Sequence, residues 1–202
     1  MVALFRIQEL AGGTLSIDNI DISTVPLDVL RKKLGIIPQD PVMFSASIRF
    51  NLDPFREFKD EDLWNVLDSV NIKEHVLSLP KKLEEEVSEG GDNFSAGQRQ
   101  LICIARAILR KPKILVLDEA TASIDNETDN LIQSMIRKEF TQCTVLTIAH
   151  RLNTIIDSDR VMVLEQGKLM ELAAPQDLLE KKDGLFKALW ERHLKSHGSG
   201  DH

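Results

Sequence analysis

Two acidic residues directly follow an apolar segment of the chain. Residues 114–117 contain no polar side chain and lead straight into Asp118 and Glu119. An uninterrupted apolar run is typical of a parallel strand that is covered on both faces. The first carboxylate can hold Mg²⁺ through its water shell, and the second can polarise an attacking water, as nucleotide hydrolysis requires. An isolated Asp-Glu pair can equally cap a strand or begin a solvated loop.

A second candidate site lies at the predicted start of a helix. Ser95, Ala96, Gly97 and Gln98 follow the polar, Gly-rich break 88–93. A serine backed by small residues at a helix N-terminus exposes several N–H groups and the positive end of the helix dipole, which together bind an anion such as phosphate. The same serine is also an ordinary helix cap.

Two more polar residues follow predicted strands. Gln39 comes after a short strand at 35–38 that ends in proline, and His150 comes after the apolar run 144–149. Ligands of an open parallel sheet bind beyond the carboxyl ends of its strands. We therefore expect Gln39, the Asp118-Glu119 pair and His150 at one edge of a sheet.

The elements that position these residues form an α/β pattern, in which a helical insertion separates strands of a mostly parallel sheet. Apolar residues recur at helical spacing in 60–70 and again in 101–109. Shorter elements are expected as follows: the end of a helix at 1–7, a half-buried strand at 14–18, a hairpin of 160–164 and 168–172 with its turn at Gln166-Gly167, and amphipathic segments at 175–180 and 185–194.

Length and composition describe an ordinary globular domain. The 202 residues are 43% hydrophobic and 28% charged, which argues against global disorder. The net charge of −7 argues against a large basic surface for nucleic acid. Cys103 and Cys143 lie far apart in apolar segments and are expected to be unpaired core residues. No apolar run approaches the roughly 20 residues of a membrane span.

In their order along the chain, these motifs resemble the nucleotide-binding domain of ATP-binding-cassette (ABC) transporters, over about residues 1–190. The correspondence is 37–41 with the Q-loop, 94–98 with the signature motif, 114–119 with Walker B and the catalytic glutamate, 123–125 with the D-loop, and His150 with the switch histidine. Ala96 departs from the pattern, because Gly or Val is usual there.

The resemblance implies ATP and Mg²⁺ as cofactors and a role for each motif. The implied catalytic residues are Glu119, His150 and Gln39. The implied nucleotide-binding residues are Ser95, Ala96, Gly97, Gln98, Asp118 and Asp125. Asp118 and Gln39 are the implied Mg²⁺ ligands, acting through water.

The resemblance also implies partners and a location. Family domains pair head to tail, so that each signature motif closes over the nucleotide on the other's P-loop. The expected partners are a second nucleotide-binding domain and the transmembrane domains of a transporter, and not nucleic acid. We expect a domain at 1–196 with a helical subdomain at about 45–112, a flexible tail at 197–202, and a place at the cytoplasmic face of a membrane, where ATP hydrolysis drives export.

Residues 45–55 narrow the resemblance to the second nucleotide-binding domain of C-subfamily exporters, the multidrug-resistance-associated proteins and the relatives of the sulfonylurea receptor. First domains of that subfamily often replace the catalytic glutamate, whereas this chain keeps Glu119.

One family motif has no counterpart in the sequence. The P-loop needs Gly-x-x-x-x-Gly-Lys-Ser/Thr, and the Gly167-Lys168 pair falls in the predicted hairpin without the other required residues. In the family, the P-loop immediately precedes a helix whose later part resembles residues 1–7. We therefore expect a P-loop-NTPase-like sheet without its N-terminal strands and P-loop, in a chain that by itself binds ATP weakly and hydrolyses it negligibly.

Two other interpretations remain. A non-hydrolysing regulatory or signature-donating module is the first, because the signature residues act on a partner's nucleotide. A chromosome-maintenance or repair ATPase is the second, but long coiled coils interrupt those domains. Residues 45–109 contain no heptad pattern, and the chain is acidic.

Overall fold

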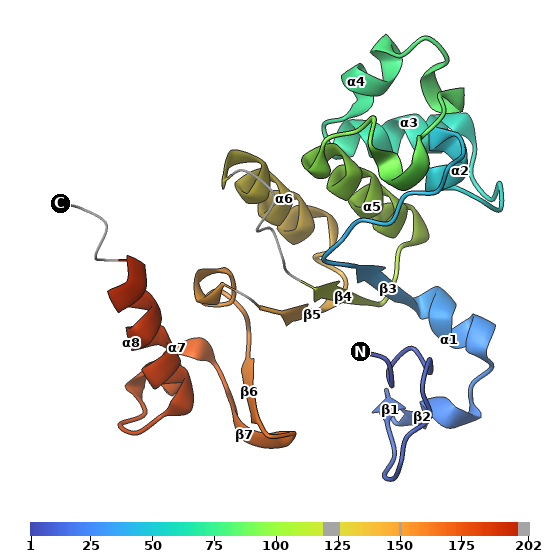
Figure 1. The fold of residues 1–202 in the computed structure, drawn as a ribbon. Coiled ribbons are helices and arrows are strands. Elements are labelled where there is room, and N and C mark those ends of the chain that lie inside the picture. Colours follow the sequence, from blue (N-terminus) through green and yellow to red (C-terminus); the bar gives the residue numbers. More distant parts are fainter. Residues whose placement is uncertain (119–125, 150, 198–202) are drawn as a thin grey trace. The chain divides into compact units, whose positions relative to one another are not determined.

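The computed structural model describes residues 1–118, 126–149 and 151–197 (Figure 1). They belong to two compact units, which span Met1–Ile148 and Ala149–His202. The expected α/β class with a parallel sheet is confirmed. None of the helices in the described ranges has the length and apolarity that crossing a membrane requires. Of the predicted tail at 197–202, His197 is the last residue of a helix, and residues 198–202 lie outside the described residues.

The first unit contains a three-stranded parallel sheet in the order β3-β4-β5, with β3 at Leu34–Ile37, β4 at Ile114–Asp118 and β5 at Thr144–Ile148. Ile37 lies opposite Leu117, and Asp118 lies opposite Ile148. The strands therefore end together at one edge of the sheet. Residues 115–117 are buried, as a central strand of apolar residues requires.

The exposure of β5 differs from the sequence expectation. Its apolar run predicts a strand covered on both faces, but all five of its residues are exposed. Within the described residues, β4 is its only strand neighbour. An apolar run identifies a strand, whereas its burial depends on which elements pack against it.

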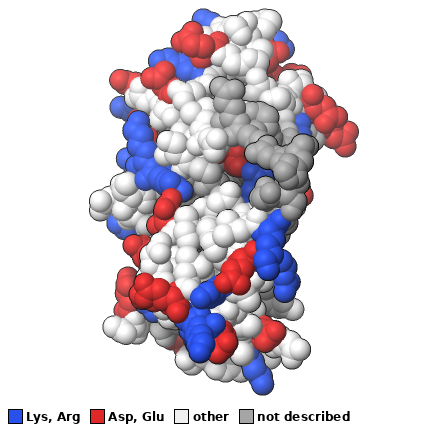
Figure 2. Space-filling view, turned by 90° about the vertical axis from the view of Figure 1, so that its left-hand side faces the viewer, with Lys and Arg blue, Asp and Glu red and all other residues white. Residues whose placement is uncertain are grey.

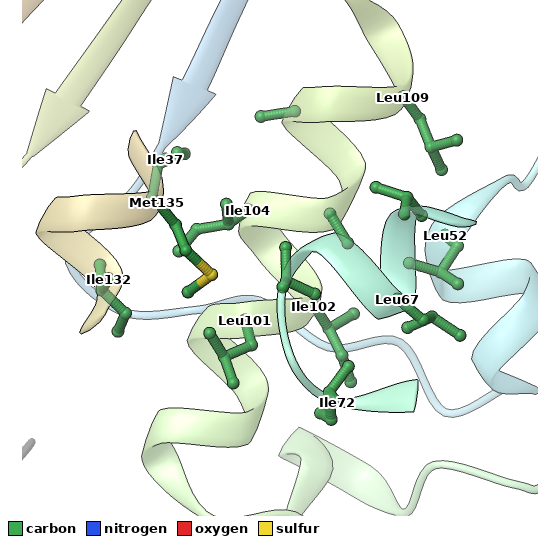
Figure 3. Close-up of a cluster of buried hydrophobic side chains, with 14 of the residues drawn as sticks. Ile37, Leu52, Leu67, Ile72, Leu101, Ile102, Ile104, Leu109, Ile132 and Met135 are labelled. Atoms are coloured by element: carbon green, nitrogen blue, oxygen red, sulfur yellow. The ribbon is translucent and has the colours of Figure 1, made fainter. Parts of the chain in front are cut away.

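Four α-helices connect β3 to β4: α2 at Ile48–Leu52, α3 at Asp60–Ser69, α4 at Lys73–Ser78 and α5 at Ala96–Arg110. Two short 3-10 helices, at Lys82–Glu84 and Glu89–Gly91, lie between α4 and α5. Helices α3 and α5 follow the predicted apolar spacing, and their buried side chains meet in one core. Figure 3 shows Ile102 and Ile104 of α5 in this core, between Leu67 and Met135. Each fully buried side chain of this size contributes about 1.5–3 kcal/mol.

Helix α6, at Asn126–Glu139, connects β4 to β5 and is not among the predicted elements. It adds Ile132 and Met135 to the core formed with α5. Cys103 is buried and Cys143 is half-buried, and both are free thiols, as predicted.

A small hairpin, a 3-10 helix at Ile22–Thr24 and one α-helix precede β3. Strand β1, at Ser16–Ile17, pairs with β2, at Ile20–Asp21, through Asp18 and Asn19. Both turn residues have positive φ, which a two-residue type I′ turn requires. The predicted strand at 14–18 is therefore present but shorter. Helix α1, at Leu27–Lys33, leads directly into β3.

Residues 1–7 form turns, so the predicted helix end is wrong. Arg6 has a φ of 47°, which an α-helix does not accept. A segment shorter than about 12–15 residues is not stably helical by itself, so tertiary contacts decide its conformation. Here the Arg6 guanidinium donates to the carbonyls of Ile22, at 3.0 Å, and Val25, at 2.5 Å.

The second unit is an antiparallel hairpin with two helices: β6 at Val161–Glu165, β7 at Lys168–Ala173, α7 at Pro175–Glu180 and α8 at Leu185–His197. The hairpin and both amphipathic segments are predicted correctly. Gln166 and Gly167 have φ values of 49° and 76°, again as a type I′ turn requires. Val163, Leu178 and Phe186 are buried in the core of this unit.

Glu171 is a buried carboxylate that caps α8. It accepts the Nζ of Lys181 at 2.7 Å and the backbone N–H groups of Phe186 at 2.9 Å and Leu185 at 3.2 Å. The bond from Lys181, followed by that from the Phe186 N–H, holds the pKa of Glu171 below its usual value of 4.5. The ionised form is therefore the one that the fold stabilises.

We expect Glu171→Ala to destabilise the second unit by about 1–2 kcal/mol at neutral pH, since it removes a helix cap and an ion pair. Because the folded pKa is depressed, this stabilisation is complete above pH 4.5 and is lost as the pH falls through the lower folded value. Acid unfolding followed by Trp190 fluorescence, in a Trp64→Phe background, measures it. Glu171→Gln cannot titrate and should lose less stability on acidification; equal losses would contradict the assignment.

Candidate functional site

Gln39 and Asp118 lie at the ends of adjacent strands, as predicted. Asp118 is the last residue of β4 and is half-buried, and Gln39 is exposed two residues beyond β3. Because Ile37 is in register with Leu117, both side chains belong to the carboxyl edge of the sheet. This is the edge at which parallel sheets bind ligands.

Three predicted site residues lie outside the described residues: Glu119, Asp125 and His150. In the sequence, Glu119 directly follows Asp118, and His150 comes two positions after the end of β5 at Ile148. Their roles remain predictions.

The predicted anion-binding segment is the N-terminus of α5. Ser95 is exposed and caps the helix, because its Oγ accepts the N–H of Gln98 at 3.1 Å. The side chain of Gln98 accepts the N–H of Ser95 in return, at 2.9 Å. Ser95 is thus an ordinary cap as well, and further N–H groups of the first helical turn have no acceptor within the helix.

Gly97 permits the close packing of α5 against α6. A Cβ atom at Gly97 would lie 3.0 Å from the Cγ2 of Thr128, near the start of α6. Few real Cβ atoms approach a neighbour so closely, so a larger residue would require the side chain of Thr128 to shift. Gly97 therefore links the predicted signature segment to the helix that follows residues 119–125.

A partly buried polar network, which the sequence did not reveal, joins the segment after Gln39 to α5. Arg106 of α5 donates from Nε to the carbonyl of Asn51, from Nη1 to the carbonyl of Val42 at 2.6 Å, and from Nη2 to Oδ1 of Asn51 at 2.7 Å. Asn51 is 2% exposed and bonds both the N–H and the carbonyl of Phe44, at 2.9 Å each. Residues 42–44 are therefore held on α5.

The guanidinium of Arg106 is suited to this position by its shape. It reaches three acceptors at once and lies 5.8 Å from the centre of the Phe44 ring. Burial lowers the pKa of Arg106 from its usual value. The sequence signal for this residue is an arginine between Ala105 and Ala107, inside an otherwise apolar helical segment.

A cavity of about 240 Å³ lies beside α2 and not at the strand edge. Its lining residues are Ala46, Ser47, Arg49, Phe50, Asp53, Pro54 and Arg56. Large apolar side chains are exposed in the same stretch of chain: Val42 at 56%, Phe44 at 53%, Phe50 at 42% and Phe55 at 75%. The rings of Phe44 and Phe50 pack edge to face, 6.1 Å apart.

The donor atoms at the strand edge fit Mg²⁺. An amide oxygen, as in Gln39, and a carboxylate, as in Asp118, are hard oxygen ligands, and Mg²⁺ in proteins usually keeps several waters and binds phosphate oxygens as well. In the described ranges, no three His, Cys, Asp or Glu side chains form a metal cluster. The edge therefore suits a Mg²⁺ ion that arrives with a nucleotide.

Comparison with known proteins agrees with this geometry. Residues 1–122 match the family model described as ABC transporter. ATP-binding cassette sub-family C member 2 of Rattus norvegicus is 56% identical over 183 residues, which are 91% of this chain and 12% of that protein. Sub-family C member 4 of Homo sapiens is 56% identical over 184 residues, 91% of this chain and 14% of that protein. The chain thus spans about an eighth of the length of these relatives.

Among solved structures, a bacterial Atm1-family ABC exporter with ATP bound aligns with a TM-score of 0.85 and 37% identity. The alignment covers 95% of this chain and 34% of the exporter chain. The chain therefore belongs to the ABC transporter family, as an ATP-binding domain homologous to members of sub-family C.

Proposed function

We propose that this chain is part of an ATP-hydrolysing domain that drives export by a C-subfamily ABC transporter, and that it corresponds to the second nucleotide-binding domain. The observation that carries the proposal is the β3–β4 register, which places Gln39 and Asp118 at one carboxyl edge. Glu119 is present at the position of the family's catalytic glutamate, which supports a domain that hydrolyses ATP. We propose residues 1–196 as the domain, with 45–112 as its helical part.

Each residue at the strand edge has a proposed task. Asp118 and Gln39 hold Mg²⁺ through water, and the ion neutralises phosphate charge. Glu119 accepts a proton from the attacking water, and His150 contacts the terminal phosphate. Ser95, Gly97 and Gln98, with the first-turn N–H groups of α5, contact the nucleotide bound by a second domain.

Transmembrane domains are the proposed partner of the face that Val42, Phe44, Phe50 and Phe55 expose. Exposed aromatic side chains in one stretch are typical of a protein interface, because they bury a large area at little entropic cost. The cavity beside α2 has Phe50 in its lining and can receive a side chain of the partner. This contact would place the domain at the cytoplasmic face of a membrane.

Pairing with a complete nucleotide-binding domain tests the proposal. The probe is a domain of an ABC exporter with its own P-loop and a Glu-to-Gln change of its catalytic glutamate, so that ATP persists. Sedimentation should show a complex with this chain in ATP and none in ADP. Equal association in both nucleotides, or none in either, would refute the proposed pairing.

ATP turnover by the 202-residue chain alone is expected to be negligible. Phosphoryl transfer depends on positioning and on charge neutralisation, and the sequence has no P-loop to hold the phosphates. The measurement is phosphate release with Mg²⁺, compared between the unchanged chain and Glu119→Gln. Turnover that Glu119→Gln abolishes would show that the chain holds the nucleotide by other means.

A further inference from the structure

Six cationic residues lie in the last turn of α1 and at the end of α5 or just after it. They are Arg31, Lys32, Lys33, Arg110, Lys111 and Lys113, and all six are exposed. The backbone N–H of Lys113 donates to the carbonyl of Lys33 at 2.8 Å, so the two segments adjoin. We call these six residues the basic cluster.

In the part of the chain that the structure describes, the basic cluster lacks acidic partners. Within the described ranges, no Asp or Glu forms an ion pair with any of its members, although the chain has 32 acidic residues. The guanidinium of Arg31 donates to the carbonyls of Phe5, at 3.0 Å, and Arg6, at 3.1 Å. On the face in Figure 2, by contrast, acidic and basic side chains are interspersed.

The dipoles of helices α1 and α5 offset only part of the positive charge of the basic cluster. A helix C-terminus carries roughly half a negative charge, so two helix ends offset about one of the six positive charges. The basic cluster also lies at the start of β3 and β4, next to Leu34 and Ile114. Because a strand advances about 3.3 Å per residue, it is separated from the Gln39–Asp118 edge by the length of the sheet.

We propose that the basic cluster docks a short acidic segment of a protein, rich in Asp and Glu or in phosphorylated side chains. Charge complementarity supports this occupant. At physiological ionic strength the screening length is about 8 Å, so charges further away than this contribute little. The binding of a short acidic segment therefore depends mainly on the charges of the basic cluster.

An extended polyanion fits less well. A bilayer surface or a nucleic acid is large enough to lie close to the rest of the chain as well as to the basic cluster. The net charge of the chain is −7, so the rest of the chain repels such a polyanion. Residues 27–37 and 108–118, which carry the cluster, contain no aromatic residue on which a base could stack.

Fluorescence polarisation tests the proposal on the 202-residue chain. The probes are a labelled peptide of about twelve Glu, Asp and Ser residues and the same peptide with phosphoserine, and we expect binding that weakens at least about fivefold between about 50 and 200 mM salt. The triple change Lys32→Glu, Lys111→Glu and Lys113→Glu should weaken it at least about tenfold. Stronger binding of the phosphoserine peptide would identify phosphate as the preferred anion within the proposal.

The matched control changes Lys81, Lys168 and Lys182 to Glu. These three lysines are also exposed, and their replacement alters the net charge by the same amount. The affinity of this control variant for the peptide should stay within about twofold of that of the unchanged chain. If the cluster variant fails to fold, a variant with Gln at the same three positions replaces it. We expect that variant to bind the peptide about threefold more weakly than the unchanged chain does. Equal effects of cluster and control variants would overturn the proposal, as would tighter binding of phosphatidylserine vesicles or oligo-dT. ATP-dependent pairing does not enter this assay, so the proposed function is tested separately.

Discussion

The Ser95→Asp substitution is expected to leave α5 as stable as before and to weaken ATP-dependent pairing at least about a hundredfold. Aspartate caps a helix as well as serine does, so the bond to the N–H of Gln98 has a replacement. A carboxylate at this exposed position would face the phosphates of the partner's nucleotide. Two unit charges about 4 Å apart repel by about 4 kcal/mol at an effective dielectric constant of about 20, more than a hundredfold requires.

This prediction separates the two roles of Ser95. Sedimentation gives the pairing affinity, and thermal unfolding gives the stability. Ser95→Thr retains both the cap and the neutral hydroxyl and serves as the matched control, with pairing expected within about threefold. Ser95→Arg should weaken pairing through its bulk. Undiminished pairing of Ser95→Asp would leave Ser95 as a helix cap and nothing more.

Arg106→Met is expected to destabilise the first unit by about 2 kcal/mol. The substitution keeps an apolar chain of similar length but leaves the carbonyl of Asn51, a residue that is 2% exposed, without its donor, and a buried acceptor without a partner costs about 1–3 kcal/mol. The carbonyl of Val42 is exposed, so water can replace Arg106 there. Urea unfolding followed by Trp64 fluorescence, in a Trp190→Phe background, reports on this unit.

Two comparisons make the Arg106 prediction specific. Arg106→Lys keeps the charge but cannot reach all three acceptors, so it should cost about half as much. Arg110→Met, one turn further along α5 at an exposed position, should change stability by less than about 0.5 kcal/mol. Amide exchange of Phe44 should quicken in both Arg106 variants. A loss below about 1 kcal/mol in Arg106→Met would mean that water satisfies the carbonyl of Asn51 as well.

Local patterns predict most of the elements around the candidate site. The apolar run before Asp118 identifies β4, and the spacing of apolar residues identifies α3 and α5, because these signals lie within a few residues of each other. The turn at Gln166-Gly167 is equally local, since its backbone geometry depends on those two residues. The motif order along the chain was sufficient for the resemblance to ABC transporters.

Burial and long-range contacts are not local properties, and here the sequence was insufficient. Residues 1–7 have a helical pattern but form turns, because contacts of Arg6 with Ile22 and Val25 outweigh a weak helical preference. Strand β5 has an apolar sequence but remains exposed.

The sequence by itself determined which chemical groups this protein has and in what order they follow its strands and helices. The tertiary structure alone decided that β5 is exposed and that Arg106 holds Asn51, which is 55 residues away in the chain. The physical reason is that periodicity reports on the face that a segment buries, whereas a hydrogen bond between distant segments forms only after packing has brought its donor and acceptor together.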